Sequence, residues 1–217
     1  MRLIAKGQEP IELTTWKKAN PHGRYPDLDK SEQGKSTRRA IRQAAIKDQF
    51  GLCAYCCKQI DEANSTNEHI ASQMATPNKT LDFTNIVASC KTPKRCNQAR
   101  GSTDLPLTPL MPECETELKF RLSGKVEGGT ERAAKTIDIL GLDTKAIREE
   151  RKQLVDALIY IKGKQPNELR LLNDDELKQL PDLFSDLDNP NETGLLSPFS
   201  PILVNIIKGI IDQAGII

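Results

Sequence analysis

The residues with the clearest chemistry in this 217-residue chain are four cysteines. Cys53 and Cys56 enclose two residues, and Cys90 and Cys96 follow with five residues between them. Two pairs of thiols at such spacings are typical of a four-thiolate zinc site, in which two tight turns supply the ligands. This zinc would be structural, because four thiolates leave no position for water or substrate. The alternative is a group of buried free thiols, since cysteine is common in protein cores.

Two further cysteines stand outside this pattern. Cys57 directly follows Cys56, which has the standard spacing to Cys53, so we expect Cys57 to point elsewhere. Cys114 is isolated and is interpreted as structural. The first ten residues turn polar too early for a signal peptide, and no apolar run is long enough to cross a membrane. A cytoplasmic location is therefore expected, where thiols stay reduced and favour metal binding over disulfides.

A glutamate and a histidine, Glu68 and His69, lie between the two cysteine pairs. Hydrolysis of a phosphodiester needs a base for the attacking water, and a neutral imidazole with a pKa near 7 can take that proton. Carboxylate oxygens suit hard divalent cations such as Mg²⁺. Neighbouring residues of a strand point to opposite faces, so both side chains reach one centre only if the backbone bends there. A lone histidine is more often structural, so its neighbours decide the interpretation.

The order of these residues resembles the HNH nuclease family. In zinc-bearing members, a Cys-x-x-Cys pair is followed by an acid–histidine pair, an asparagine before an aliphatic run, and a cysteine before a basic–glycine end. The matching elements here are Cys53/Cys56, Glu68-His69, Asn85, Cys90, Cys96-Asn97 and Arg100-Gly101. The resemblance implies an α+β fold. Its centre would be a ββα-metal (HNH) nuclease core with a structural zinc knuckle, surrounded by mostly helical N- and C-terminal extensions.

The resemblance also implies roles for individual residues. His69 would be the general base, and Asn85 would brace the loop that carries it. Glu68 and Asn97 would hold a catalytic Mg²⁺ or Mn²⁺ ion, with Asn97 in place of a histidine. The substrate backbone would be held by basic side chains near the end of the segment, namely Lys94, Arg95 and Arg100.

Over residues 1–160 the chain looks like one group of HNH proteins, the PtuB subunits of Septu anti-phage systems, which also occur with retrons. That resemblance implies an endonuclease that cleaves nucleic acid, either DNA or an RNA such as tRNA. It also implies a PtuA-like partner, an ABC- or SMC-type ATPase. Retron versions would add a reverse transcriptase and its RNA–DNA product. A different class remains open, namely a zinc-knuckle module that binds nucleic acid or serves as an adaptor without catalysis.

The surrounding elements divide the chain into four parts. Residues 1–50 form a leader, irregular over 1–34, and a basic helix over 37–49 that Ser36 caps and Gly51 follows. Residues 51–101 form the zinc-stapled core. Residues 102–165 continue the same domain, and residues 166–217 form an acidic and apolar helical extension. This extension could dock a partner or pack on the chain's own core.

Periodicity defines the elements after the core. We expect a loop over 102–116, a strand or hairpin over 118–126, a helix over 130–140 ended by Gly141, and a longer helix reaching 161. Residues 1–101 hold 17 Lys and Arg against 10 Asp and Glu, whereas residues 102–217 hold 14 against 20. This asymmetry suggests a polyanionic partner for the first half, although an uneven solvated surface explains it equally well.

Overall fold

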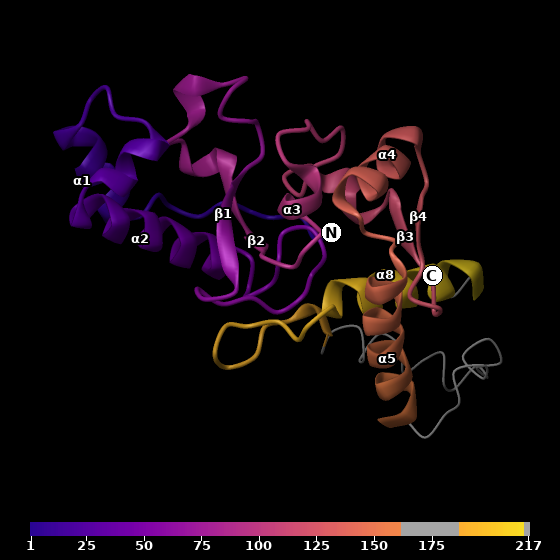
Figure 1. Ribbon diagram of the computed structural model, residues 1–217. Helices are drawn as coiled ribbons and strands as arrows, with labels where there is room; N and C mark the ends of the chain where they lie inside the picture. Colours follow the sequence, from indigo (N-terminus) through magenta and orange to yellow (C-terminus); the bar gives the residue numbers. More distant parts are fainter. Residues whose placement is uncertain (162–186, 215–217) are drawn as a thin grey trace.

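A computed structural model describes residues 1–161 and 187–214 of the chain. It shows a mixed α+β architecture in which helices surround two small antiparallel sheets (Figure 1). The α-helices are α1 (Ile11–Ala19), α2 (Glu32–Asp48), α3 (Asn97–Arg100), α4 (Glu131–Leu140), α5 (Lys145–Ile161) and α8 (Ser200–Ala214). The strands are β1 (Ser65–His69), β2 (Ile86–Cys90), β3 (Leu118–Phe120) and β4 (Val126–Gly128). The α+β class is therefore confirmed.

The first sheet pairs β1 with β2, so that Ser65 lies opposite Cys90 and His69 opposite Ile86. Helix α2 packs along this sheet (Figure 1). Gln49, directly after α2, fastens the helix to β2, because its side chain donates to the Ala88 carbonyl at 2.8 Å and accepts from the Ala88 amide at 2.7 Å. This contact joins the start of the segment that carries Cys53 and Cys56 to the strand that ends at Cys90.

The N-terminal region contains more helix than the sequence analysis predicted. Helix α1 lies within the stretch expected to be irregular, and it buries Leu13 and Trp16 on one face. Helix α2 begins at Glu32, where Ser31 rather than Ser36 caps it by accepting from the Gly34 amide at 3.0 Å. Pro21, Gly23 and Pro26 therefore lie between α1 and α2 and do not prevent either helix, since apolar burial outweighs local propensity.

The elements after the core follow their predicted positions. Strands β3 and β4 form the expected hairpin. Helix α4 begins after Thr130, whose hydroxyl accepts from the Ala133 amide, and ends at Gly141 in the left-handed conformation (φ 59°). Helix α5 follows directly. The hairpin is closed on one side by α4 and on another by α8 (Figure 1).

Helix α8 packs on the chain's own core. Of the two interpretations of the C-terminal extension, docking of a partner or packing on the core, the structure therefore favours packing for this helix. Its residues Ile202, Leu203, Val204, Ile206 and Ile207 are buried. Part of this extension, residues 166–186, lies outside the described residues, and this part includes most of its acidic stretch over 174–188. In the described ranges 1–161 and 187–214, no helix combines the length and apolarity that crossing a membrane requires.

Candidate functional site

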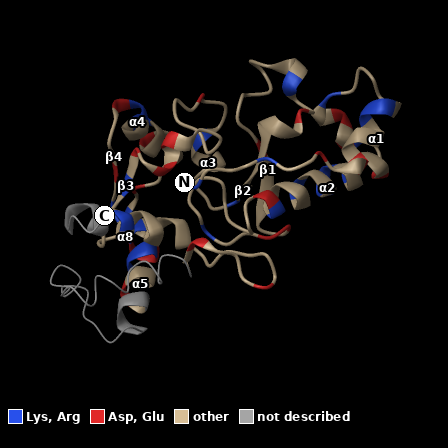
Figure 2. Cartoon of the chain, turned by 180° about the vertical axis from the view of Figure 1, so that it is seen from behind, with Lys and Arg blue, Asp and Glu red and all other residues tan. Residues whose placement is uncertain are grey.

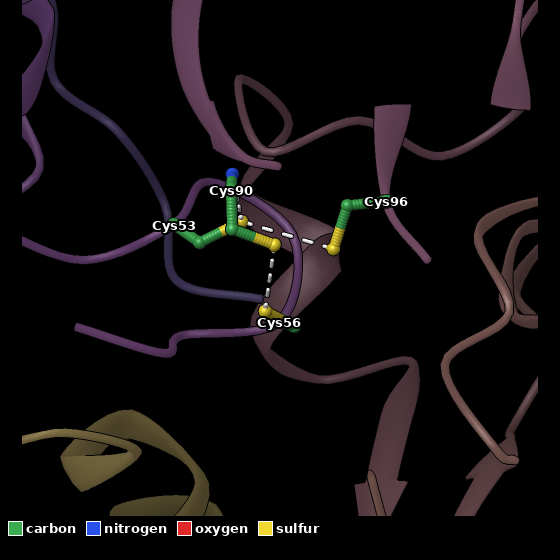
Figure 3. A group of neighbouring side chains, drawn as sticks. All are labelled: Cys53, Cys56, Cys90 and Cys96. Atoms are coloured by element: carbon green, nitrogen blue, oxygen red, sulfur yellow. Dashed lines mark hydrogen bonds between the residues drawn. The ribbon is translucent and has the colours of Figure 1, made fainter. Parts of the chain in front are cut away.

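The four predicted zinc ligands come together in the fold (Figure 3). The sulfur of Cys53 lies 3.8 Å from that of Cys96, the sulfur of Cys56 lies 3.9 Å from that of Cys90, and all four lie within 4.8 Å of one another. A tetrahedron with zinc–sulfur bonds of about 2.3 Å has edges of about 3.8 Å. Two of the sulfur–sulfur distances equal this edge closely, and the four thiols are near enough to one another to hold one zinc ion.

The two cysteine pairs reach this cluster through tight turns. In the first, the Cys53 amide donates to the Lys58 carbonyl at 2.8 Å, and Cys57 adopts a positive φ of 60° that directs it away from the cluster. In the second, Cys96 has a φ of 56° directly before α3. The Cys90 amide donates to the Cys53 sulfur at 3.3 Å, a contact that favours a thiolate. Cys57 and Cys114 are buried outside the four-sulfur group.

His69 is the last residue of β1, and its ring is fixed by contacts on two sides. Nε2 lies 2.9 Å from the Thr80 carbonyl, which can only accept, so Nε2 carries the proton and Nδ1 is the hydrogen-bond acceptor of the ring. The Gln73 amide lies 3.3 Å from Nδ1, and Tyr25 packs edge-on at 4.7 Å between ring centroids. Burial lowers the pKa of His69 below its ordinary value, which favours the neutral imidazole.

Asn85 ties the segment after His69 to the start of β2. Its side chain accepts from the Ala71 amide at 2.8 Å and donates to the Ala71 carbonyl at 3.1 Å. It also donates to the Lys79 carbonyl, one residue before the Thr80 carbonyl that holds the His69 ring. Asn85 therefore fixes both ends of the loop that leaves β1.

Glu68 lies on the opposite face of β1 from His69, as strand alternation requires. The chain bends directly after His69, at Ile70 and Ala71. The Glu68 carboxylate accepts from the Arg100 guanidinium at 2.7 Å and from the Tyr55 hydroxyl at 3.2 Å. Burial raises the pKa of this carboxyl, and Arg100 opposes the rise.

Asn97 begins α3 one turn before Arg100. Its side-chain oxygen Oδ1 is buried and has no hydrogen-bond partner within the described chain. An unpartnered buried carbonyl oxygen is costly, so such an atom is a natural position for a ligand. A carboxylate and an amide oxygen are donors that Mg²⁺ and Mn²⁺ accept, and the chemistry of the two predicted ligands therefore fits such an ion.

Two curated proteins are similar to this chain, whereas no family model matches it. The first, "Retron Vc95 putative HNH endonuclease" of Vibrio cholerae serotype O1 biovar El Tor, is 26% identical over 185 residues, covering 78% of this chain and 90% of that protein. The second, "Retron Ec83 putative HNH endonuclease" of Escherichia coli, is 32% identical over 97 residues, or 42% of this chain and 37% of that protein. The resemblance to the HNH endonucleases, with a retron association, is confirmed.

The basic residues predicted to contact substrate lie in different environments. Arg95 is buried and forms a two-pronged ion pair with Glu150 at 2.9 and 3.0 Å. Arg100 is buried as well, and it donates to the backbone carbonyls of His69 and Ile70 in addition to the Glu68 carboxylate. Both guanidinium groups are used inside the protein, which does not fit the predicted contact with a phosphate backbone. Lys94 is exposed and stays available for it.

The basic face of α2 is also partly neutralised. Figure 2 shows acidic residues interspersed with the basic ones around this helix. Lys35 pairs with Glu32 at 2.7 Å, and Arg38 pairs with Asp29. Arg39 and Lys47 are exposed on the helix surface. The charge asymmetry counted from the sequence therefore does not correspond to an uninterrupted basic helix face.

Sequence reasoning missed the side chains that orient the two central residues. Tyr25 and Gln73 contact His69, and Tyr55 contacts Glu68. Tyr55 carries a local signal, its place inside the Cys53–Cys56 pair, but that spacing accounts for the cysteines alone. Tyr25 lies 44 positions before His69 in the printed sequence, and only the packing of the N-terminal region onto β1 brings them together.

Proposed function

We propose that this chain is a metal-dependent HNH endonuclease that hydrolyses phosphodiester bonds of nucleic acid. The observation that carries the proposal is the orientation of His69, whose Nε2 faces the Thr80 carbonyl at 2.9 Å. This contact fixes the tautomer in which Nδ1 is basic. A histidine held by a carbonyl in this way is prepared to accept a proton and to be stabilised as imidazolium afterwards.

In the proposed reaction, Nδ1 of His69 takes the proton from the attacking water, which would replace the Gln73 side-chain amide that contacts Nδ1 at 3.3 Å. The Thr80 carbonyl stabilises the resulting positive charge on the ring, and Asn85 keeps the loop in place. Glu68 and the Oδ1 atom of Asn97 would hold a Mg²⁺ or Mn²⁺ ion. When bound, that ion neutralises charge on the phosphate and on the leaving oxygen. Strands β1 and β2 with helix α3 would form the ββα-metal core.

The four cysteines would hold a structural Zn²⁺ ion. The closeness of their four sulfur atoms supports this assignment, and a closed four-thiolate shell has no reactive position. The zinc would fasten the start of α3, where Asn97 lies, to the turn that carries Cys53 and Cys56. The last residue of α3, Arg100, contacts Glu68 at 2.7 Å. The contribution of the zinc to activity is then the placement of these residues.

The names of the two relatives support a retron context for the proposed nuclease. We propose that the chain is a PtuB-like effector of a Septu or retron anti-phage system, acting with a PtuA-like ATPase. A reverse transcriptase and its RNA–DNA product would join it in a retron. An adjacent ATPase or reverse transcriptase gene would support this context, and the absence of both would contradict it.

The decisive experiment compares His69→Ala with His22→Ala. The chain has only two histidines, and His22 is exposed in the N-terminal region, so its substitution controls for the loss of an imidazole. With Mg²⁺ or Mn²⁺ present, His69→Ala is expected to slow cleavage of DNA or RNA roughly 100- to 10,000-fold, the usual contribution of a general base. His22→Ala should cleave at the wild-type rate.

Two results would contradict the proposal. If His69→Ala retains both metal-dependent cleavage and phage protection, the assignment of the base is wrong. If the zinc-loaded wild-type chain, tested with its ATPase partner on DNA and RNA, binds nucleic acid without cleaving it, the protein is the non-catalytic zinc-knuckle adaptor.

A further inference from the structure

Tyr55 lies between the two ligands of the first cysteine pair, and its side chain points into the protein. It is only 1% exposed. Because Cys53 and Cys56 flank it and both sulfurs belong to the four-thiol cluster, the backbone at Tyr55 is fixed wherever the cluster is formed. A buried tyrosine hydroxyl needs a hydrogen-bond partner, and here the partners identify a role.

The Tyr55 hydroxyl belongs to a closed triangle of hydrogen bonds. It donates to Oε1 of Glu68 at 3.2 Å and accepts from Nη1 of Arg100 at 3.1 Å, while Nη1 also donates to the same Oε1 at 2.7 Å. Burial raises the pKa of Tyr55 well above its ordinary value, so the hydroxyl stays protonated and remains a donor. The three side chains therefore hold one another in place.

This triangle leaves one side of the carboxylate open. In the described part of the chain, the hydrogen bonds to Glu68 all reach Oε1, so Oε2 is left for a ligand. Arg100 cannot easily follow Glu68 elsewhere, because it also donates to the carbonyls of His69 at 2.8 Å, Ile70 at 2.6 Å and Thr103 at 2.7 Å. The carboxylate is thus oriented before any cation arrives.

We infer that Tyr55 and Arg100 are positioning residues that orient Glu68 for the divalent cation, and that Tyr55 connects the zinc knuckle to the cation site. The inference rests on the proposed function, since it requires Glu68 to be a cation ligand. Groups that hydrogen-bond to a metal ligand commonly change metal affinity by 10- to 100-fold when they are removed. Tyr55 would then contribute to cation binding without touching the cation.

Tyr25 provides a matched control on the other face of β1. Its side chain is also buried, and its hydroxyl accepts two hydrogen bonds, from Asn67 at 2.7 Å and from Arg38 at 3.0 Å. It packs against the ring of His69, and the partners of its hydroxyl are Asn67 and Arg38 rather than Glu68. Tyr25→Phe and Tyr55→Phe therefore each remove one buried hydroxyl, but only the second removes a donor to the proposed cation ligand.

The test is a titration of the full-length, zinc-loaded chain with Mn²⁺, with free Mn²⁺ measured by electron paramagnetic resonance. Tyr55→Phe is expected to raise the Mn²⁺ dissociation constant roughly tenfold, whereas Tyr25→Phe should leave it unchanged. Glu68→Gln should abolish binding at this site. Zinc content and thermal unfolding, measured on each variant, establish that the knuckle is intact.

Two results would overturn the inference. One leaves the proposed nuclease in place, and the other also rejects the proposed cation site. An unchanged dissociation constant in Tyr55→Phe, with Glu68-dependent binding in the wild type, rejects the positioning role and leaves the proposed nuclease in place. A wild-type chain without Glu68-dependent Mn²⁺ binding rejects both the inference and the proposed cation site.

A measurement on the wild-type chain covers the case in which Tyr55→Phe does not fold. Tyrosines labelled with ¹³C at Cζ would be followed by nuclear magnetic resonance during a Mg²⁺ titration. The Tyr55 signal should shift as Mg²⁺ binds, and the Tyr25 signal should not. A Tyr55 signal that stays unmoved at saturating Mg²⁺ overturns the positioning role.

Discussion

Asn85 is the residue through which the loop after β1 is held in place. It binds both backbone groups of Ala71 and the carbonyl of Lys79. Asn85→Ala removes these bonds and lets the loop shift relative to His69, and a displacement of about 1 Å can lower a reaction rate about 100-fold. We expect that decrease in single-turnover cleavage, with zinc content unchanged.

Asn85→Asp is the matched variant for this prediction. It keeps an oxygen that accepts from the Ala71 amide but loses the donor to the Ala71 and Lys79 carbonyls. Its rate should lie below the wild-type rate. Wild-type cleavage by Asn85→Ala would show that the loop does not depend on this side chain.

The adjacent cysteines Cys56 and Cys57 allow a second comparison at the residue scale. Cys56 belongs to the four-sulfur cluster, whereas Cys57 is buried outside it. Cys56→Ala is expected to lose stoichiometric zinc and cooperative unfolding, because structural zinc binding contributes folding free energy directly. Cys57→Ala should retain one zinc per chain, as measured by metal analysis. Zinc retention by Cys56→Ala would mean that another group supplies the ligand.

Among the elements, α2 depends on a glycine near its start. A Cβ added at Gly34 would lie 2.3 Å from the Leu28 carbonyl oxygen, a contact with backbone that cannot move easily. Gly34→Ala is therefore expected to lower the free energy of unfolding by about 1–3 kcal/mol. Gly209 in α8 is the matched control, since a Cβ there meets nothing within 4 Å.

Gly209→Ala should instead stabilise the protein by about 0.5–1 kcal/mol, because alanine loses less backbone entropy in a helix. Urea unfolding of the two variants measures both changes. Equal effects of the two substitutions would mean that α2 does not pack against Leu28 as described.

At the scale of the whole molecule, α8 connects the C-terminal region to the hairpin through Asn205. Its side chain accepts from the Phe120 amide at 3.0 Å and donates to the carbonyls of Glu115 at 2.8 Å and Leu118 at 3.0 Å. Asn205→Ala leaves these backbone groups without partners, and we expect a loss of about 1–3 kcal/mol in the free energy of unfolding. Stability equal to the wild type would indicate that α8 is a detachable surface helix.

The sequence by itself predicted the cysteine cluster and the helices after residue 130, which the structure contains, and it singled out Glu68, His69 and Asn85 as candidates. These depend on spacing, on the ligand chemistry of thiolates, and on capping residues such as Thr130 and Gly141, which act over a few positions. Alternation along a strand also predicted that Glu68 and His69 face opposite sides.

Only the tertiary structure decided which side chains serve those residues. Arg95 and Arg100 look like phosphate contacts in the sequence, but burial forces each to find an internal acceptor, which Glu150 and Glu68 provide. Helix α1 is stabilised because it packs against α2 and buries the apolar side chains of Leu13 and Trp16. Tyr25 and Tyr55 reach the two faces of β1 through contacts between distant segments. Desolvation and long-range packing are properties of the assembled fold, and local spacing does not encode them.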